Sequence, residues 1–374
     1  DFMFEEMKQP GGAILAGLEH LDDRYLRAVG YATKSKRGTL PKMVLVGDIV
    51  GDDEDRVARA TSEVIRLANG RSGEGFVAVS ADARKKFWAD RKRTAAIAKH
   101  TNAFKVNEDV VIPLPRMGEY TLGIERINIE LSLRNKLAIV DALSSFIQSG
   151  NLRMGKVEDA EELPSPEQLT EKVNTALTHL STVRGRWQFL YDNIDVPLST
   201  VGDQLVALGY EQHRNGTYTE QAGDTVFNLL QTWSIRASWK KEIRDELAKV
   251  FTGAALSPIV DELKRIHKQV LRGRVWVALH MHAGDGNVHT NLPVNSDNYE
   301  MLQTAHEAVA RIMKLARSLD GVISGEHGIG ITKLEFLSDD EIANFTAYKQ
   351  KVDPEGRFNK GKLLRGAALK ALGD

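Results

Sequence analysis

The chain has 374 residues, of which 42% are hydrophobic and 27% charged, and 50 basic side chains nearly balance 51 acidic ones. These proportions are typical of a globular protein of about two domains, and they argue against disorder, a fibrous class and charge-driven binding of nucleic acid. Because the chain has no cysteine, disulfides, thiolate nucleophiles and cysteine-based metal sites are excluded, and any metal needs nitrogen and oxygen ligands.

The first elements indicate a layer of strands and helices. A short apolar run at 41–47 predicts a strand, and helical spacing over 52–67 predicts a helix, with Asn69-Gly70 as its stop. Residues 76–80 predict a second strand, 81–100 a second helix, and 107–113 a strand that is closed by a proline.

The middle of the chain has a different pattern. Long amphipathic helical patterns cover 124–147, 166–191 and 234–271, and Ser165 is a plausible N-cap for the second of them. We therefore expect residues 118–272 to form a helical insertion. No fixed-period repeat is found, which argues against a solenoid.

The last part returns to strands and helices. A strand is predicted at 274–280 and a helix at 298–319, with Leu302, Ala305, Val309, Ile312 and Ala316 on one face. Turn formers at 353–362 precede a last short helix. The fold class is thus α+β. We expect four segments: a first α+β part at 1–117, the helical insertion at 118–272, a second α+β part at 273–345, and a C-terminal helical segment at 346–374.

Three of the ten histidines stand together after the strand predicted at 274–280. His280 and His282 share one face if the strand continues to them, because strand side chains repeat with period two. The glycine-rich turn 284–287 lets His289 fold back toward His282. These two imidazoles could then bind one metal ion.

A carboxylate and a further imidazole stand side by side in the glycine-rich segment 324–330. Glu326 can complete a site of two histidines and one carboxylate, which suits a catalytic zinc or similar divalent ion with an open position for substrate. His327 would be available as a general base, since imidazoles titrate near neutral pH. A histidine beside a glycine turn is more often a packed or solvated side chain, but two such dense motifs favour a metal site.

Nucleotide sites receive no support from the sequence. Neither a phosphate-binding Walker loop nor a Gly-x-Gly-x-x-Gly motif after a strand is present, which argues against nucleotide hydrolysis and NAD binding. The basic helix at 85–99 is readily explained as a solvated face, although one of its arginines could bind a carboxylate.

The sequence resembles the C-terminal, substrate-binding half of FAD-linked oxidases of the vanillyl-alcohol oxidase type. These include D-lactate dehydrogenases, glycolate oxidase subunits and D-2-hydroxyglutarate dehydrogenases. Three motifs carry the resemblance: His-x-Gly-Asp-Gly-Asn-x-His at 282–289, Gly-Glu-His-Gly-Ile-Gly at 325–330 and Asp-Pro-x-Gly-x-x-Asn-x-Gly-Lys-Leu at 353–363. The resemblance implies a ferredoxin-like cap domain with an antiparallel sheet, into which a long helical segment is inserted.

The resemblance also implies roles for individual residues. It makes His282, His289 and Glu326 the ligands of zinc or manganese, and His327 the base. Further implied contacts are Arg91 and Asn291 to the substrate, and Asn287 and Asn359 to the flavin.

The implied reaction is oxidation of a small D-2-hydroxy acid to a 2-oxo acid, with hydride transfer to FAD and a downstream electron acceptor. The family's flavin domain has no counterpart here, and the chain starts without methionine. We therefore expect a piece of a longer polypeptide whose FAD-binding domain is its partner, located in the cytoplasm or at the periphery of the inner membrane. In place of the substrate lysine of D-2-hydroxyglutarate dehydrogenases stands Asn107, with Lys105 nearby, which weakens a preference for dicarboxylates.

Two other readings use the same residues. A metal-dependent hydrolase could employ two histidines and one glutamate without a flavin. A non-catalytic helical module with a structural metal would need a closed, four-ligand site, with His280 as the fourth ligand.

Overall fold

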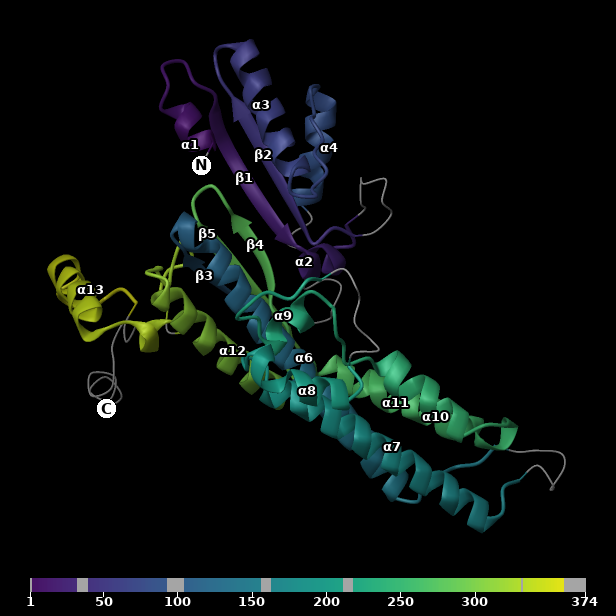
Figure 1. The fold of residues 1–374 in the computed structure, drawn as a ribbon. Coiled ribbons are helices and arrows are strands. Elements are labelled where there is room, and N and C mark those ends of the chain that lie inside the picture. Colours follow the sequence, from purple (N-terminus) through teal and green to yellow (C-terminus); the bar gives the residue numbers. More distant parts are fainter. Residues whose placement is uncertain are drawn as a thin grey trace. The chain divides into compact units, whose positions relative to one another are not determined.

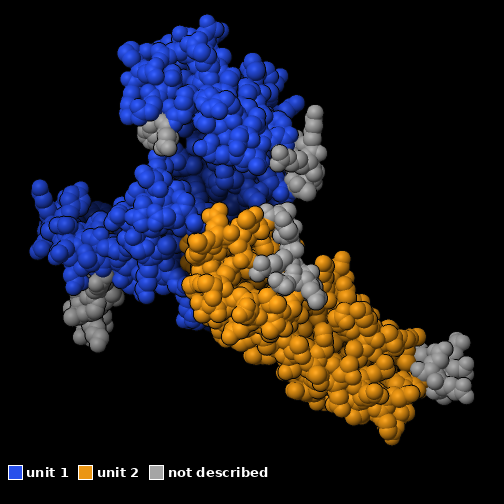
Figure 2. Space-filling model, viewed as in Figure 1, with its two compact units in different colours: residues 1–122, 277–374 blue, residues 123–276 orange. Residues whose placement is uncertain are grey.

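The computed structural model describes residues 2–31, 40–92, 104–155, 163–210, 218–330 and 332–359. The chain divides into two compact units, which Figure 2 colours separately. Unit 1 comprises Asp1–Leu122 and Val277–Asp374, and unit 2 comprises Gly123–Trp276. Among the described residues, none of the helices has the length and apolar character that crossing a membrane requires.

Unit 1 is built on a five-stranded antiparallel sheet in the order β2-β1-β4-β5-β3 (Figure 1). Its strands are β1 (Ile14–Asp22), β2 (Met43–Val50), β3 (Phe104–Val111), β4 (Ala278–His282) and β5 (Asn287–Val294). Its helices are α1 (Phe2–Met7), α2 (Asp23–Ala28), α3 (Glu54–Asn69), α4 (Ala81–Lys92), the 3-10 turn η2 (Leu114–Arg116), the start of α6 (Met117–Gln148), α12 (Tyr299–Ser318), the 3-10 turn η7 (Leu334–Phe336) and α13 (Asp339–Val352). The predicted α+β fold with an antiparallel sheet is confirmed.

Helix α12 packs on β3 and β5. Four of the five residues predicted on its buried face, Ala305, Val309, Ile312 and Ala316, are buried. Asn298 caps the helix, because its side chain accepts a hydrogen bond from the backbone N–H of Met301. The 3.6-residue period therefore identified which side of α12 faces the sheet.

One predicted strand is wrong. Residues 76–80 have an apolar run but form no strand, and Val77 and Val79 are exposed. A strand exists only when a neighbouring strand accepts its hydrogen bonds, and an apolar run alone does not supply that partner. The predicted helix 81–100 is confirmed up to Lys92, and the remainder lies outside the described residues. The last short helix, expected beyond 362, also lies outside them.

In the described residues of unit 2, all named elements are helices. It contains the rest of α6, α7 (Pro166–Asp192), α8 (Leu198–Ala207), α9 (Val226–Gln231), the π-helical turn η5 (Trp239–Arg244), α10 (Asp245–Val250), the 3-10 turn η6 (Ala254–Leu256) and α11 (Ser257–Arg272). Ser165 forms a capping box with Gln168 at the start of α7, as its position predicted. Leu143, Leu180 and Trp187 are among the side chains fully buried in the core of this unit.

The helical pattern over 234–271 is interrupted, which the sequence reading did not anticipate. Gly253 takes a left-handed φ of 95°, and Pro258 lies in the first turn of α11. Glycine adopts that backbone without a Cβ penalty, and proline suits the start of a helix. The two residues therefore divide one apparent helix into α10 and α11.

Candidate metal centre

The histidine cluster of unit 1 lies on one face of the sheet. In the strand register His282 pairs with Glu19 of β1 and with Asn287 of β5, while His280 pairs with His289. Residues opposite one another in antiparallel strands point to the same face. The register therefore places His280, His282 and His289 on one face, as predicted for the first two.

The turn between β4 and β5 reverses the chain, so that the two strands pair side by side as an antiparallel hairpin. Gly286 has a left-handed φ of 75°, and its carbonyl accepts a hydrogen bond of 2.8 Å from the backbone N–H of Ile112. A Cβ at Gly286 would stand 2.3 Å from the Ile112 carbonyl oxygen. Glycine is therefore required here by both backbone conformation and space.

His282, His289 and Glu326 form the predicted group of possible metal ligands. One ligand atom from each lies within 4.8 Å of the others. The Glu326 Oε1 oxygen is 2.7 Å from His289 Nε2 and 3.4 Å from His282 Nε2. The three side chains thus converge, two from the β4–β5 hairpin and one from the loop after α12.

The two imidazoles differ in what holds them. His282 Nδ1 lies 2.8 Å from Glu19 Oε1, and since a carboxylate can only accept, Nδ1 carries the proton, which directs Nε2 of the neutral ring toward a metal. Both ring nitrogens of His289 are buried, and none of the described residues forms a hydrogen bond to them; the 2.7 Å approach of Glu326 is a charge contact only. Burial lowers the pKa of His289 to about 4, which the neighbouring Glu326 carboxylate only partly opposes. His289 is therefore neutral at pH 7, the form that binds metals.

Asp109 of β3 holds the loop that carries Glu326 and His327. Its Oδ2 accepts hydrogen bonds from the backbone N–H groups of Gly325 at 2.7 Å, of His327 at 3.1 Å, and of Glu326. Its Oδ1 accepts one from the buried Lys333 ammonium. Burial alone would raise the pKa of Asp109, but these donors outweigh it and hold the pKa to about 2.

His327 lies beside the ligand group. Its ring centroid is 5.0 Å from that of His289, its Nδ1 is 3.7 Å from Asp109 Oδ1, and 35% of its side chain is exposed. His327 thus combines contact with the cluster and access from outside, and it is not one of the three possible metal ligands.

The predicted flavin and substrate contacts are spread more widely. Asn287 stands under the loop, so that a Cβ at Gly325 would meet its Oδ1 at 2.5 Å. Asn291 is fully buried, and its Nδ2 approaches the His289 carbonyl and His280 Nδ1. Asn359 has a φ of 47° on an exposed turn beyond α13. The Arg91 side chain lies outside the described residues, and all four roles stay predictions.

The geometry of His280 argues against a closed, four-ligand site. Its ring stacks on that of His289 with centroids 4.3 Å apart and an interplanar angle of 9°. An ion about 2.0–2.1 Å from an imidazole nitrogen lies near that ring's plane, and one ion cannot lie in two stacked planes.

Sequence reasoning missed Glu19, Asp109 and Lys333. Two consecutive acids in a strand, Glu108-Asp109, and a lysine soon after a glycine-rich motif were visible signals. Their meaning depends on which strands are neighbours, and the sequence does not show that.

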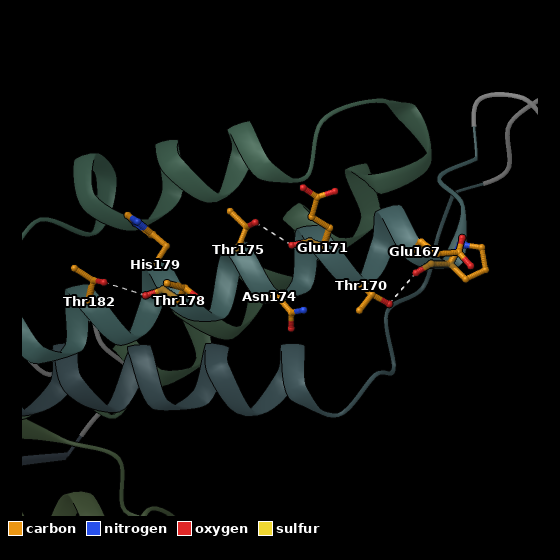
Figure 3. A pocket seen from close by; sticks show the side chains of 9 residues that line it. Glu167, Thr170, Glu171, Asn174, Thr175, Thr178, His179 and Thr182 are labelled. Carbon is orange, nitrogen blue, oxygen red and sulfur yellow. Dashed lines mark hydrogen bonds between the residues drawn. The ribbon is translucent and has the colours of Figure 1, made fainter.

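A cleft of 930 Å³ lies elsewhere, on α7 of unit 2 (Figure 3). Figure 3 shows threonine hydroxyls along it that donate to carbonyls of their own helix, Thr170 to Pro166 at 2.8 Å and Thr182 to Thr178 at 3.0 Å. These hydroxyls are already used within the helix. Among the described residues, the group of three possible metal ligands lies at the histidine cluster of unit 1 and not in this cleft. The chemistry therefore points to unit 1 rather than to this cleft on unit 2.

Comparison with known proteins identifies relatives of parts of this chain. Glycolate oxidase subunit GlcD of Escherichia coli (strain K12) is 36% identical over 114 residues, which are 29% of this chain and 22% of that protein. D-lactate dehydrogenase [cytochrome] 1, mitochondrial, of Saccharomyces cerevisiae is 27% identical over 175 residues, which are 44% of this chain and 29% of that protein. D-lactate dehydrogenase of Archaeoglobus fulgidus is 40% identical over 87 residues, or 22% of this chain and 19% of that protein.

The matched segments thus span less than a third of each of these relatives. The family described as FAD linked oxidases, C-terminal domain, matches residues 3–140 and 250–363, which is more than half of the chain. The chain therefore belongs to the C-terminal domain family of the FAD-linked oxidases.

Proposed function

We propose that this chain is the substrate- and metal-binding part of a flavin-dependent dehydrogenase that oxidises a D-2-hydroxy acid to a 2-oxo acid. The observation that carries the proposal is the convergence of His282, His289 and Glu326, in which the buried ring nitrogens of His289 have no hydrogen bond within the described part of the chain. Family membership and the two kinds of relative, a glycolate oxidase subunit and D-lactate dehydrogenases, support the flavin and the hydroxy acid.

The donor set fits a divalent ion such as zinc or manganese. Glu326 Oε1 is 3.4 Å from His282 Nε2 and 2.7 Å from His289 Nε2, so these two imidazoles and one carboxylate are close enough together to hold one ion. The bond from His282 Nδ1 to Glu19 is the kind of outer contact that orients a metal-binding histidine. Three protein ligands would leave a position for the substrate's oxygens.

When bound, such an ion would acidify the hydroxyl of the substrate, while the flavin would accept the hydride from its Cα. His327 would take up the hydroxyl proton. The Asp109 carboxylate faces Nδ1 of this ring and so favours the tautomer with its proton there, which leaves Nε2 as the acceptor. Arg91 is the proposed partner of the substrate carboxylate.

The flavin itself would be held mainly by another domain of a longer polypeptide. From the flavin, electrons would pass to a downstream acceptor. Helix α13 has the features of a docking element for that domain. Phe345, Tyr348 and Val352 are exposed at helical spacing on one face, and none of the α13 residues is buried. A metal-dependent hydrolase is not favoured, because the chain belongs to a family of oxidases.

The first experiment measures zinc and manganese in the purified chain and in His282→Ala and Glu326→Ala. We expect about one ion per chain, lost in both variants, because a site of three ligands loses most of its affinity with any one of them. His306→Ala is the matched control, since His306 is an exposed histidine of α12. Absence of metal in the parent chain, even with excess zinc or manganese, refutes the site.

A second experiment addresses the substrate class without requiring turnover. The chain is loaded with Co²⁺, and the visible absorption of the ion is recorded on addition of D-lactate, L-lactate or acetate. We expect D-lactate to change the spectrum at lower concentrations than L-lactate, and acetate to have little effect, because only a hydroxy acid offers two oxygens. Equal responses to all three would contradict the hydroxy acid assignment.

A further inference from the structure

Asp109 and Lys333 form a buried ion pair whose position next to the metal centre calls for an explanation. Asp109 is 0% and Lys333 1% exposed, and the ammonium also donates a 2.8 Å hydrogen bond to the Asp109 carbonyl. Burying two charges has a desolvation cost that their attraction often only just offsets. A pair of this kind is better explained by what it orders than by the stability it adds.

The pair orders the segment that carries two functional groups. Three consecutive backbone N–H groups, those of residues 325–327, point at one oxygen of Asp109. With three donors converging on one oxygen, the loop's backbone must wrap around the carboxylate. The Glu326 side chain then extends toward His289, and the His327 ring lies beside the same histidine.

The contacts also explain why the residue is an aspartate. One carboxylate oxygen accepts from the loop amides and the other from Lys333, so donors face both oxygens. A carboxylate can only accept, whereas an asparagine would turn an N–H₂ group toward one of these two sets of donors. Charged acceptors also form stronger hydrogen bonds than neutral ones.

We propose that Asp109, held by Lys333, is the positioning residue that shapes the 325–327 backbone and thereby assembles Glu326 and His327 with the two histidines. The inference rests on the proposed function for its consequence at the metal, but its structural part stands on the amide contacts. Asp109 itself would touch neither substrate nor metal.

The test uses Asp109→Asn, Lys333→Met and the double variant, with Glu108→Gln as the matched control. Glu108 is the adjacent buried acid and lies 3.5 Å from the Lys333 ammonium, but its side chain is not among the acceptors of the loop amides. Hydrogen exchange of the amides of residues 325–327 and the affinity for Zn²⁺ are measured in each variant.

In Asp109→Asn we expect amide exchange at 325–327 to become at least about 10-fold faster and Zn²⁺ affinity to fall about 10- to 100-fold, the usual effect of losing an outer partner. Glu108→Gln should change neither by more than about 3-fold. Should Asp109→Asn fail to fold, the double variant is used to test the inference. It removes both buried charges, so neither is left unpaired. It should regain thermal stability while its loop amides still exchange faster and Zn²⁺ still binds weakly.

Full recovery of slow exchange and zinc affinity in the double variant would show a merely structural pair and overturn the inference. Unchanged amide exchange in Asp109→Asn, or equal acceleration in Glu108→Gln, would also overturn it. Failure of the unsubstituted chain to bind Zn²⁺ would instead refute the proposed function, and the exchange data would still decide the role of Asp109.

Discussion

Replacing Gly286 by alanine should destabilise unit 1, whereas the same change at Gly284 in the same turn should not. At Gly286 the new Cβ meets the Ile112 carbonyl oxygen at 2.3 Å, and the φ of 75° is a left-handed one. At Gly284 the nearest atoms are ordinary contacts at 3.9 Å or more. The two variants differ in position alone, so each controls for the other.

The magnitude follows from two terms. A left-handed backbone costs a residue with a Cβ about 1–2 kcal/mol. Displacing the turn also weakens the 2.8 Å hydrogen bond between Ile112 and Gly286, worth about 1 kcal/mol. We expect Gly286→Ala to lose about 2–3 kcal/mol, and Gly284→Ala to stay within about 0.5 kcal/mol of the parent.

The assay is thermal unfolding followed by far-ultraviolet circular dichroism, with zinc affinity as a second readout. For about 200 residues, 1 kcal/mol shifts the midpoint by roughly 2–4 °C, so Gly286→Ala should melt roughly 4–12 °C earlier. Its zinc affinity should fall as well, since the displaced turn carries His282 and His289. Equal midpoints for the two alanine variants would refute the reasoning.

Three further predictions concern other parts of the molecule. Burial lowers the pKa of His20 to about 4, below its unfolded value of 6.5, so stability is full above pH 6.5 and falls by up to about 3 kcal/mol as pH drops toward 4. In urea unfolding, the stability of His20→Phe should depend less on pH than that of the parent chain. An unchanged dependence of stability on pH would contradict the role given to His20. Gly325→Ala should weaken zinc binding because its Cβ would meet Asn287, and adding Asn287→Ala should restore part of the affinity; no rescue would exclude that clash as the cause. Leu143→Ala should lower stability by about 2–5 kcal/mol in denaturant titrations, against little change for the exposed Leu122→Ala of the same helix, while an equal loss in both would contradict the packing argument.

Much of the site could be predicted from short-range pattern. Strand period placed His280 and His282 on one face, and the glycines of the next turn predicted the return of His289. The N-cap at Ser165 and the buried face of α12 followed from the same local rules. These features depend on residues within about two turns of one another, where backbone geometry leaves few choices.

Other features depended on partners far away along the chain. Residues 76–80 have a strand-like pattern, but none of the described strands pairs with them. Glu19 reaches His282 across 263 positions, and Asp109 reaches the 325–327 amides across more than 200. The local sequence of either acid does not show which distant residue it contacts.

The sequence by itself determined the residues with metal-binding chemistry and the turns that return them, because residue type and backbone freedom are local properties. Only the tertiary structure decided that β1 and β3 flank the β4–β5 hairpin, and with them which acids hold the histidine and the loop. Strand order is set by the burial of whole faces and by hydrogen bonds between distant segments, and these are properties of the assembled sheet rather than of any one segment.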